Sequence, residues 1–182
     1  MASSPLAFVV IAGPQASGKS TLAKALADGL RADGERVALV ELDQIAAMAL
    51  PTLPGWDTAH RIFESVVGSW LGSDLTCVVA EGSGSADEVA GLRALAPAGV
   101  ATLTVATTST FDVAFSRAQA DPTRGISRDH GFLSGVYERW SDELARINPD
   151  VVIDTGAVGL DQGVELVRTA IAAARAAERR DA

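Results

Sequence analysis

Cysteine and histidine are scarce in this chain of 182 residues. Because Cys77 is the only cysteine, no internal disulfide can form, and we expect a reducing, cytoplasmic compartment. Cys77 lies in an apolar run, which is typical of a buried thiol rather than of a nucleophile. The two histidines, His60 and His130, have no histidine or cysteine at metal-ligand spacing, so the sequence disfavours a zinc site.

The chain also lacks the positive charge of a nucleic-acid-binding protein. Lys and Arg number 15 against 23 Asp and Glu, and the formal net charge is −8. Without a basic excess to neutralise phosphates, we expect no nucleic acid as the main partner. No apolar run is long enough to span a membrane, and residues 1–5 lack the basic start of a signal peptide. We therefore expect no membrane partner either.

Short apolar runs alternate with helical patterns along the whole sequence. Such alternation is typical of a parallel sheet that helices cover on both faces, which makes the expected fold class α/β with three layers. The length favours a single domain, residues 1–182. Strands are predicted at 6–12, 36–42, 76–80, 100–106 and 150–153; helices are predicted from Lys19 and at 44–50, 56–71, 86–95, 110–120, 132–147 and 160–177, with residues 178–180 frayed.

The most specific pattern is GPQASGKS at residues 13–20, a complete Walker A motif between a predicted strand and a predicted helix. Its glycines allow the loop to turn backbone N–H groups inward as an anion site, and the helix dipole adds to it. Lys19 can reach the β- and γ-phosphates of ATP, and the Ser20 hydroxyl can bind Mg²⁺. The residues expected at the nucleotide are Gly13, Gln15, Ala16, Ser17, Gly18, Lys19, Ser20 and Thr21.

Two carboxylates follow neighbouring apolar strands and are expected at the same sheet edge. Asp43 can take the proton of a substrate hydroxyl as it attacks the γ-phosphorus, or it can cap the next helix; the two roles are compatible. Glu81 can bind Mg²⁺ through water or hold Lys19 or Asp43, and an ordinary strand-end turn is the alternative. Gly82, directly after it, leaves room for a substrate.

A polar segment broken at Pro122 and Gly125 carries several arginines. We predict a lid at about residues 117–131, in which Arg124 and Arg128 stabilise charge on the transferring phosphoryl group. A solvated charged loop is the alternative. For the acceptor site, the candidates are Trp56, as a substrate wall in a loop, and Arg61, as a grip on a polar group; Arg61 and Glu64 as a surface pair is equally open. Trp70 and Trp140 are expected in the core.

These residues together resemble the small P-loop kinases of metabolites, namely chloramphenicol phosphotransferase, shikimate kinase, gluconate kinase and adenylylsulfate kinase. LDQIAAM at 42–48 looks like the segment of chloramphenicol phosphotransferase whose aspartate is the proposed base. Arg117 and Arg124 are similar to the shikimate kinase pair in which the first stacks on adenine and the second meets the phosphates. HRIFE at 60–64 is similar to the R-x-x-E helix whose arginine holds the substrate carboxylate.

The resemblance implies a P-loop NTPase fold with strand order 2-3-1-4-5 and a lid. It also implies a monomeric or homodimeric enzyme that moves the γ-phosphate of MgATP to a hydroxyl of a metabolite, sugar or antibiotic-like molecule. Shikimate itself is disfavoured, because Ile45 replaces the second aspartate of the family's D-x-D and EGSG at 81–84 replaces its triple glycine.

Two alternatives stay open at this point. A nucleotide or nucleoside kinase is the nearest, although no arginine stands beside the EGS run at 81–83. A P-loop NTPase without small-molecule transfer is the other. Its GTPase form needs an N-K-x-D base reader, and the only asparagine, Asn148, is followed by proline.

Overall fold

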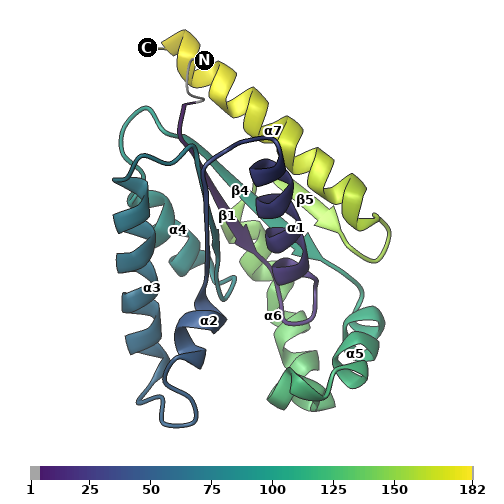
Figure 1. The fold of residues 1–182 in the computed structure, drawn as a ribbon. Coiled ribbons are helices and arrows are strands. Elements are labelled where there is room, and N and C mark those ends of the chain that lie inside the picture. The colour runs from purple at the N-terminus through teal and green to yellow at the C-terminus, as the bar shows by residue number, and fades with distance from the viewer. Residues whose placement is uncertain (1–4, 182) are drawn as a thin grey trace.

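A parallel sheet of five strands stands at the centre of the computed structural model, which describes residues 5–181 (Figure 1). The strand order is β2–β3–β1–β4–β5, as the resemblance implied, and every neighbouring pair is parallel. All residues of β1 and β3 are buried, which explains why both read as continuous apolar runs. The strands are β1 (Ala7–Ala12), β2 (Val37–Glu41), β3 (Cys77–Glu81), β4 (Ala101–Thr108) and β5 (Val151–Asp154).

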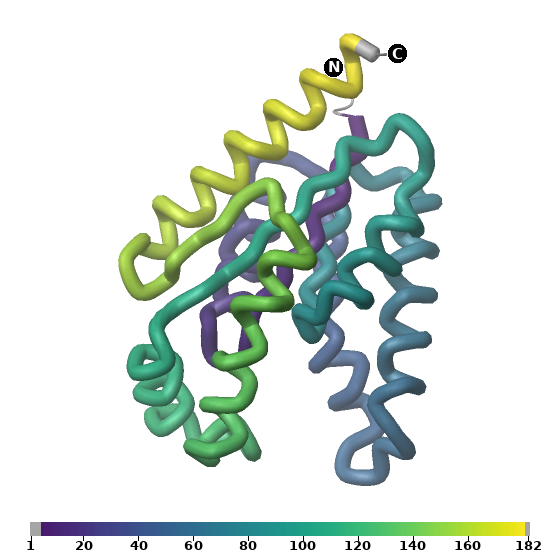
Figure 2. The backbone as a smooth tube through the Cα atoms, turned by 180° about the vertical axis from the view of Figure 1, so that it is seen from behind, coloured from purple at the N-terminus to yellow at the C-terminus, as the bar shows by residue number. Residues whose placement is uncertain are grey.

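Helices cover both faces of the sheet, and alternate residues of β1 separate the two cores. Phe8 and Val10 pack with residues of the helices on one face, whereas Val9 and Ile11 pack with those on the other. The first face carries α2 (Leu42–Ala47), α3 (Trp56–Leu71), α4 (Ala86–Ala94) and α6 (His130–Ile147), and the second carries α1 (Lys19–Ala32) and α7 (Leu160–Asp181) (Figures 1 and 2).

The carboxyl ends of the strands face the part of the molecule where the remaining elements lie. Here α5 (Phe111–Ala120) and the 3₁₀ helix η1 (Pro122–Arg128) extend beyond the sheet on one side, and α2 with the start of α3 does so on the other (Figure 1). The loop between β1 and α1 lies at this same edge. The topology therefore brings the strand-end residues together, as expected of an open α/β sheet.

Three sequence predictions differ from the structure. Helix α2 begins at Leu42, so Asp43 lies inside its first turn instead of in front of it. Trp70 is 45% exposed on the outer face of α3, not in the core, whereas Trp140 is buried as predicted. Helix α7 continues through residues 178–180 to Asp181 instead of fraying. In its last third, α7 is held to the body of the protein by the Arg175 guanidinium, which binds both carboxylate oxygens of Glu35 at 2.8 and 2.7 Å.

No helix among the described residues has the length and apolar character that crossing a bilayer requires.

Candidate active site

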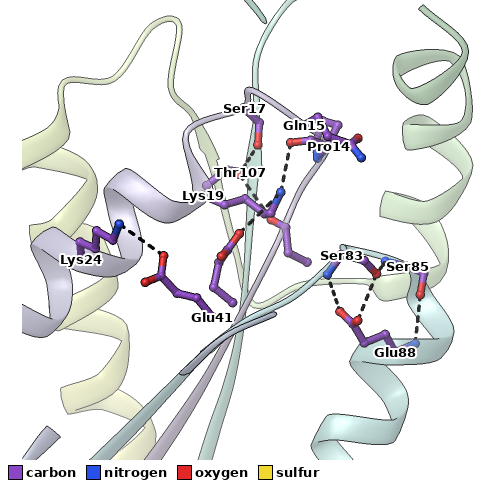
Figure 3. A network of polar contacts seen from close by, with 12 residues as sticks. Pro14, Gln15, Ser17, Lys19, Lys24, Glu41, Ser83, Ser85, Glu88 and Thr107 are labelled. Atoms are coloured by element: carbon purple, nitrogen blue, oxygen red, sulfur yellow. Dashed lines mark hydrogen bonds and ion pairs between the residues drawn. The ribbon is translucent and has the colours of Figure 1, made fainter. Parts of the chain in front are cut away.

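The loop between β1 and α1 is shaped by close packing against β4. A β-carbon on Gly13 would lie 2.7 Å from the Thr107 carbonyl oxygen and 2.8 Å from Ser17 Oγ, so only glycine fits there. The fully buried Ser17 hydroxyl lies 2.7 Å from Thr107 Oγ1 and ties the loop to β4 (Figure 3). Gly18, the residue before α1, has a φ of 95° in the left-handed region that favours glycine. The loop geometry is thus built into the sheet.

Lys19 crosses this loop from the first turn of α1. Its Nζ donates to the Pro14 carbonyl at 3.3 Å and lies 3.7 Å from Glu81 Oε1, with a side chain that is 11% exposed (Figure 3). The ammonium group is therefore held between the loop and the end of β3. A cation at the positive end of a helix, above a ring of backbone donors, forms a site for a polyanion such as a triphosphate.

Glu81 is a buried carboxyl whose side chain is 4% exposed. Burial, with smaller contributions from the charges of Asp43 and Glu41, raises its pKa to about 7, although Lys19 and the Ser20 hydroxyl act to lower it. A carboxyl in such surroundings becomes fully ionised when another cation approaches. Glu81 is thus suited to holding Lys19 and to meeting a metal ion.

The protein oxygens at this edge fit Mg²⁺ that arrives with a nucleotide. The described residues contain no cluster of three or more His, Cys, Asp or Glu that could hold a metal alone. Mg²⁺ prefers one or two protein oxygens and completes its octahedron with phosphate oxygens and water. Ser20 and Glu81, the metal ligands predicted from the sequence, both line the cavity at the loop and carry oxygens of the kind that Mg²⁺ takes.

The structure brings most of the predicted residues into one small cavity of about 50 Å³. Asp43 reaches it from α2 and Arg124 from η1, on opposite sides of the loop. Asp43 is exposed, and its carboxylate has no hydrogen bond or ion pair among the described residues. Because Glu41 occupies the N-cap position of α2, the capping interpretation of Asp43 is wrong. The lining residues are Gln15, Ala16, Gly18, Lys19, Ser20, Thr21, Asp43, Glu81 and Arg124.

A second cavity, of about 400 Å³, lies on the α7 side of the loop. Arg117 of α5 closes one wall: it donates to the Thr155 carbonyl and hydroxyl, each at 2.8 Å, and to the Ala16 carbonyl at 3.4 Å. Thr155 Oγ1 lies 2.6 Å from the Ser17 carbonyl oxygen. Most of the other walls are apolar, and the flat ring of a nucleotide base fits such a lining. The cavity also contacts Gly18, Thr21, Leu22, Arg124, Ile153, Val158, Gly159, Leu160 and Gly163.

A third cavity, of about 260 Å³, lies on the opposite side of the loop. Sequence reasoning missed it, because its walls come from the loop after β3 and from α6, which only the fold brings together. The exposed Arg139 has no hydrogen bond or ion pair among the described residues, and the buried Trp140 Nε1 has no hydrogen-bond partner there. The Arg139 guanidinium on the wall of this pocket can therefore donate to a ligand. The lining of the pocket is Gly13, Pro14, Gln15, Ser83, Gly84, Ser85, Val136, Arg139, Trp140 and Glu143.

Some predicted site residues lie elsewhere. Arg61 lines a groove on the outer face of α3 and donates to Thr58 Oγ1 at 3.3 Å. Trp56 is the first residue of α3 and not part of a loop; it is 53% exposed, and its ring lies 6.5 Å from that of His60. Arg128 is exposed on η1. Gly82 is the first residue of the loop after β3; it is buried and packs against the side chain of Glu88.

The predicted lid, residues 117–131, comprises the end of α5, all of η1 and the start of α6. Arg124 pairs with Asp121 at 3.1 Å on the same turn and keeps a side chain that is 40% exposed. His130 is exposed, with its ring edge-on to Phe111 at 5.0 Å and Phe115 at 5.1 Å.

No protein-family profile and no curated protein sequence matches the chain. Solved structures do match it over nearly their whole length. Shikimate kinase from Bacteroides thetaiotaomicron has a TM-score of 0.65 at 17% identity, over 90% of this chain and 97% of that one. A gluconokinase from Sinorhizobium meliloti 1021 has a TM-score of 0.62 at 22% identity, over 98% and 96%. Shikimate kinase from Acinetobacter baumannii in complex with shikimate has 0.64 at 16%, over 93% and 95%.

The fold and the loop define the class: this chain has the P-loop fold of the small-molecule kinases. The solved structures that share this fold are named as kinases of different substrates, namely shikimate kinase and gluconokinase. The similarity therefore shows the fold and does not identify the acceptor.

Proposed function

We propose that the protein transfers the γ-phosphoryl group of MgATP to a hydroxyl group of a small molecule. One observation carries this proposal: a single cavity at the phosphate loop joins Lys19, Ser20, Asp43, Glu81 and Arg124. These are a phosphate-binding cation, two possible metal ligands, a free carboxylate and a second cation. Phosphoryl transfer depends almost entirely on positioning and electrostatic stabilisation, and this set provides both.

The nucleotide occupies both sides of residues 13–18 in this proposal. The second cavity takes the base, with Arg117 along its wall, and the phosphates lie on the loop under Lys19. Ser20 and Glu81 are the residues that would hold Mg²⁺, which would supply positive charge beside the transferring phosphoryl group. Arg124, which borders both cavities, meets the transferring group from the lid side.

Asp43 is the proposed general base. Its carboxylate accepts the proton of the acceptor hydroxyl while that oxygen forms a bond to the γ-phosphorus. The bond from the γ-phosphorus to the bridging oxygen breaks, and ADP leaves with the electron pair. Asp43 suits this role better than Glu81, because Asp43 is exposed and unpaired among the described residues whereas Glu81 is buried against Lys19.

The third cavity is the proposed acceptor site. It begins at Gly13 and Gln15 of the phosphate loop and ends at Arg139 and Glu143 of α6. Within the described part of the chain, Arg139 on its wall is an exposed cation without a partner. A free guanidinium favours an acceptor that carries further oxygen atoms besides its hydroxyl group. Trp56 and Arg61 remain predicted contacts that this cavity does not include.

A screen for ADP release tests the proposal. MgATP is incubated with separate pools of hydroxy acids, sugars and polyols, hydroxylated antibiotics, and nucleosides and nucleotides, and the Lys19→Ala variant serves as the inactive control. We expect one of the first three pools to raise ADP release many-fold in the parent and not in the variant. Stimulation by the last pool alone identifies a nucleotide or nucleoside kinase, and ADP release that no pool changes contradicts transfer.

A further inference from the structure

The loop after β3 is held by a carboxylate to which the proposed mechanism gives no role. Glu88, in the first turn of α4, has a side chain that is 5% exposed. Its Oε1 accepts from the Ser83 backbone N–H at 2.7 Å, and its Oε2 accepts from the Ser83 hydroxyl at 3.1 Å (Figure 3). Nδ1 of His60 in α3 lies 2.8 Å from the same Oε2. One buried carboxylate thus joins α3, α4 and this loop.

This arrangement departs from an ordinary helix cap. Ser85–Glu88 has the S-x-x-E pattern of a capping box, and Ser85 Oγ does accept from the Glu88 N–H at 3.2 Å. In a capping box the glutamate would return to the N–H of Ser85. Here it reaches two residues further, to Ser83, and the N–H of Ser85 donates instead to Ser83 Oγ at 3.4 Å. The N–H of Ala86, in the first turn of α4, donates to Glu143 of α6 at 2.6 Å. The carboxylate is therefore directed into the loop.

The loop in turn lies directly against the phosphate loop. The N–H of Gly82 donates to the Ile11 carbonyl at 3.4 Å, and a β-carbon on Gly84 would lie 2.7 Å from the Gly13 carbonyl oxygen. Gly82 itself packs so closely on Glu88 that a side chain there would overlap the carboxylate. Residues 82–84 therefore lie in direct contact with the end of β1 and the first glycine of the Walker motif.

We infer that Glu88 is a positioning residue: through Ser83 it fixes the loop at 82–85 between the acceptor cavity and the phosphate loop, and through His60 it ties that position to α3. The inference rests on the proposed function, since Ser83, Gly84 and Ser85 line the proposed acceptor site. Glu88 itself touches neither nucleotide nor acceptor in this account. It sets where the acceptor hydroxyl lies relative to the γ-phosphate, and errors in such placement lower transfer strongly.

The test compares Glu88→Gln, His60→Ala and His60→Asn with the parent. An asparagine at position 60 can place an amide N–H where Nδ1 lies, so it should rescue what alanine loses. Asp87→Asn is the matched control, because Asp87 is exposed on the same turn and pairs with Arg146 on the surface. All variants are made in the full chain. Amide hydrogen exchange at residues 82–85 is measured with and without MgADP, which serves as the nucleotide probe.

We expect Glu88→Gln and His60→Ala to speed exchange at residues 82–85 about tenfold or more. The His60→Asn and Asp87→Asn variants should stay close to the parent, and MgADP affinity should stay within about twofold in all four. Unchanged exchange in Glu88→Gln overturns the inference. So does faster exchange spread over the sheet, which would mark a purely structural role. If Glu88→Gln does not fold, His60→Ala, which keeps the carboxylate, decides the question.

A kinetic measurement on the alcohol identified in the screen separates positioning from folding. Glu88→Gln should raise KM for the alcohol about tenfold, with KM for MgATP unchanged. Equal losses for both substrates contradict the inference. Because the exchange measurement needs no alcohol, a screen that finds no acceptor refutes the proposed function while the exchange result still decides whether Glu88 holds the loop.

Discussion

Asp43 and Glu81 are two carboxylates at one sheet edge in opposite surroundings. Asp43 is exposed in the first turn of α2 and unpaired among the described residues, whereas Glu81 is buried beside Lys19 at the end of β3. Burial raises the pKa of Glu81 to about 7, so its charge depends on the cations near it. Two carboxylates whose environments differ in this way are suited to different roles, here a base and an anchor for cations.

Replacing Asp43 with Asn should cut transfer to the acceptor by about 10² to 10⁴ while MgATP binding stays nearly unchanged, because a general base is lost and the shape is kept. Since Asp43 is not the helix cap, Asp43→Ala and Asp43→Asn should agree in their free energy of unfolding to within about 1 kcal/mol. Steady-state kinetics and thermal unfolding measure the two effects. Transfer at the parent rate in Asp43→Asn would move the base to Glu81.

Replacing Glu81 with Gln should change the pH dependence of stability in the nucleotide-free protein. The folded-state pKa of about 7 lies above the ordinary value of 4.5, so the contribution of protonated Glu81 to folding is complete below pH 4.5 and is lost as pH rises through 7. The amide that Glu81→Gln introduces does not titrate. We therefore expect the melting temperature of the variant to rise relative to that of the parent as pH rises from 4.5 to about 7. A difference that stays constant with pH in thermal unfolding would contradict the assigned pKa.

At the scale of elements, two segments approach the phosphate loop from opposite sides. The loop at 82–85 packs on Gly13, and η1 brings Arg124 to the cavity that the Walker residues line. Neither approach follows from helix or strand propensity alone. Both follow from the strand order, which places β3 and β4 on either side of β1.

Arg124→Ala should lower kcat about a hundredfold with little change in MgATP affinity, because a donor aimed at developing charge acts mainly in the transition state. Arg128→Ala is the comparison within η1: Arg128 is exposed and lines none of the three cavities described at the phosphate loop, so we expect a smaller loss. Transfer kinetics and equilibrium binding of MgATP distinguish the effects. A loss of affinity without a loss of kcat would make Arg124 a binding residue.

Gly84→Ala should weaken MgATP binding about tenfold or more, because its β-carbon would meet the Gly13 carbonyl oxygen at 2.7 Å and displace the phosphate loop. Gly99→Ala is the matched control. Gly99 also has a positive φ, of 77°, but nothing lies within 4 Å of an added β-carbon. Both variants carry a backbone cost of about 1–2 kcal/mol, so only the difference in MgATP affinity reports the contact. Equal affinities would show that the two loops move independently.

On the scale of the whole molecule, periodicity and strand-end polarity predicted the elements well because they are local signals. The layers agree with the structure, as does the strand order that the family resemblance implied, and α3 was predicted with its observed ends. The cavity that contains Arg139 could not be predicted, since it depends on contacts between segments far apart in the sequence, such as Ala86 with Glu143. The role of Glu88 could not be predicted either, because it depends on the packing of α4 against His60 of α3. The S-x-x-E pattern at 85–88 was the one local signal for Glu88.

A buried contact between Arg175 and Glu35, at the far edge of the sheet, leads to a prediction about the stability of the whole fold. Arg175, 7% exposed, joins α7 to Glu35 and to the Thr76 carbonyl at 2.6 Å, and the hydrogen bonds from Arg175 lower the pKa of Glu35. Arg175→Met should destabilise the fold by on the order of 3 kcal/mol near neutral pH. Because the lowered pKa of Glu35 makes the pair stabilising above about pH 4.5, the loss of unfolding free energy in Arg175→Met should shrink as pH falls through the folded-state pKa of Glu35.

The control for Arg175 is Arg168→Met, which removes the more exposed contact with Asp33 and should cost less than about 1 kcal/mol. Urea unfolding at several pH values measures both variants. A deficit in Arg175→Met no larger than that of Arg168→Met would show that the buried pair contributes little.

Phosphorus NMR of the complete reaction tests the central claim most directly, because it follows the γ-phosphoryl group itself. MgATP, the protein and each pool of hydroxylated compounds are observed together, with Lys19→Ala as the blank. The account predicts that the γ-phosphate signal of ATP is replaced by a phosphate monoester in an amount equal to the ADP formed. Inorganic phosphate as the sole product, formed at the same rate with every pool and with none, would contradict it.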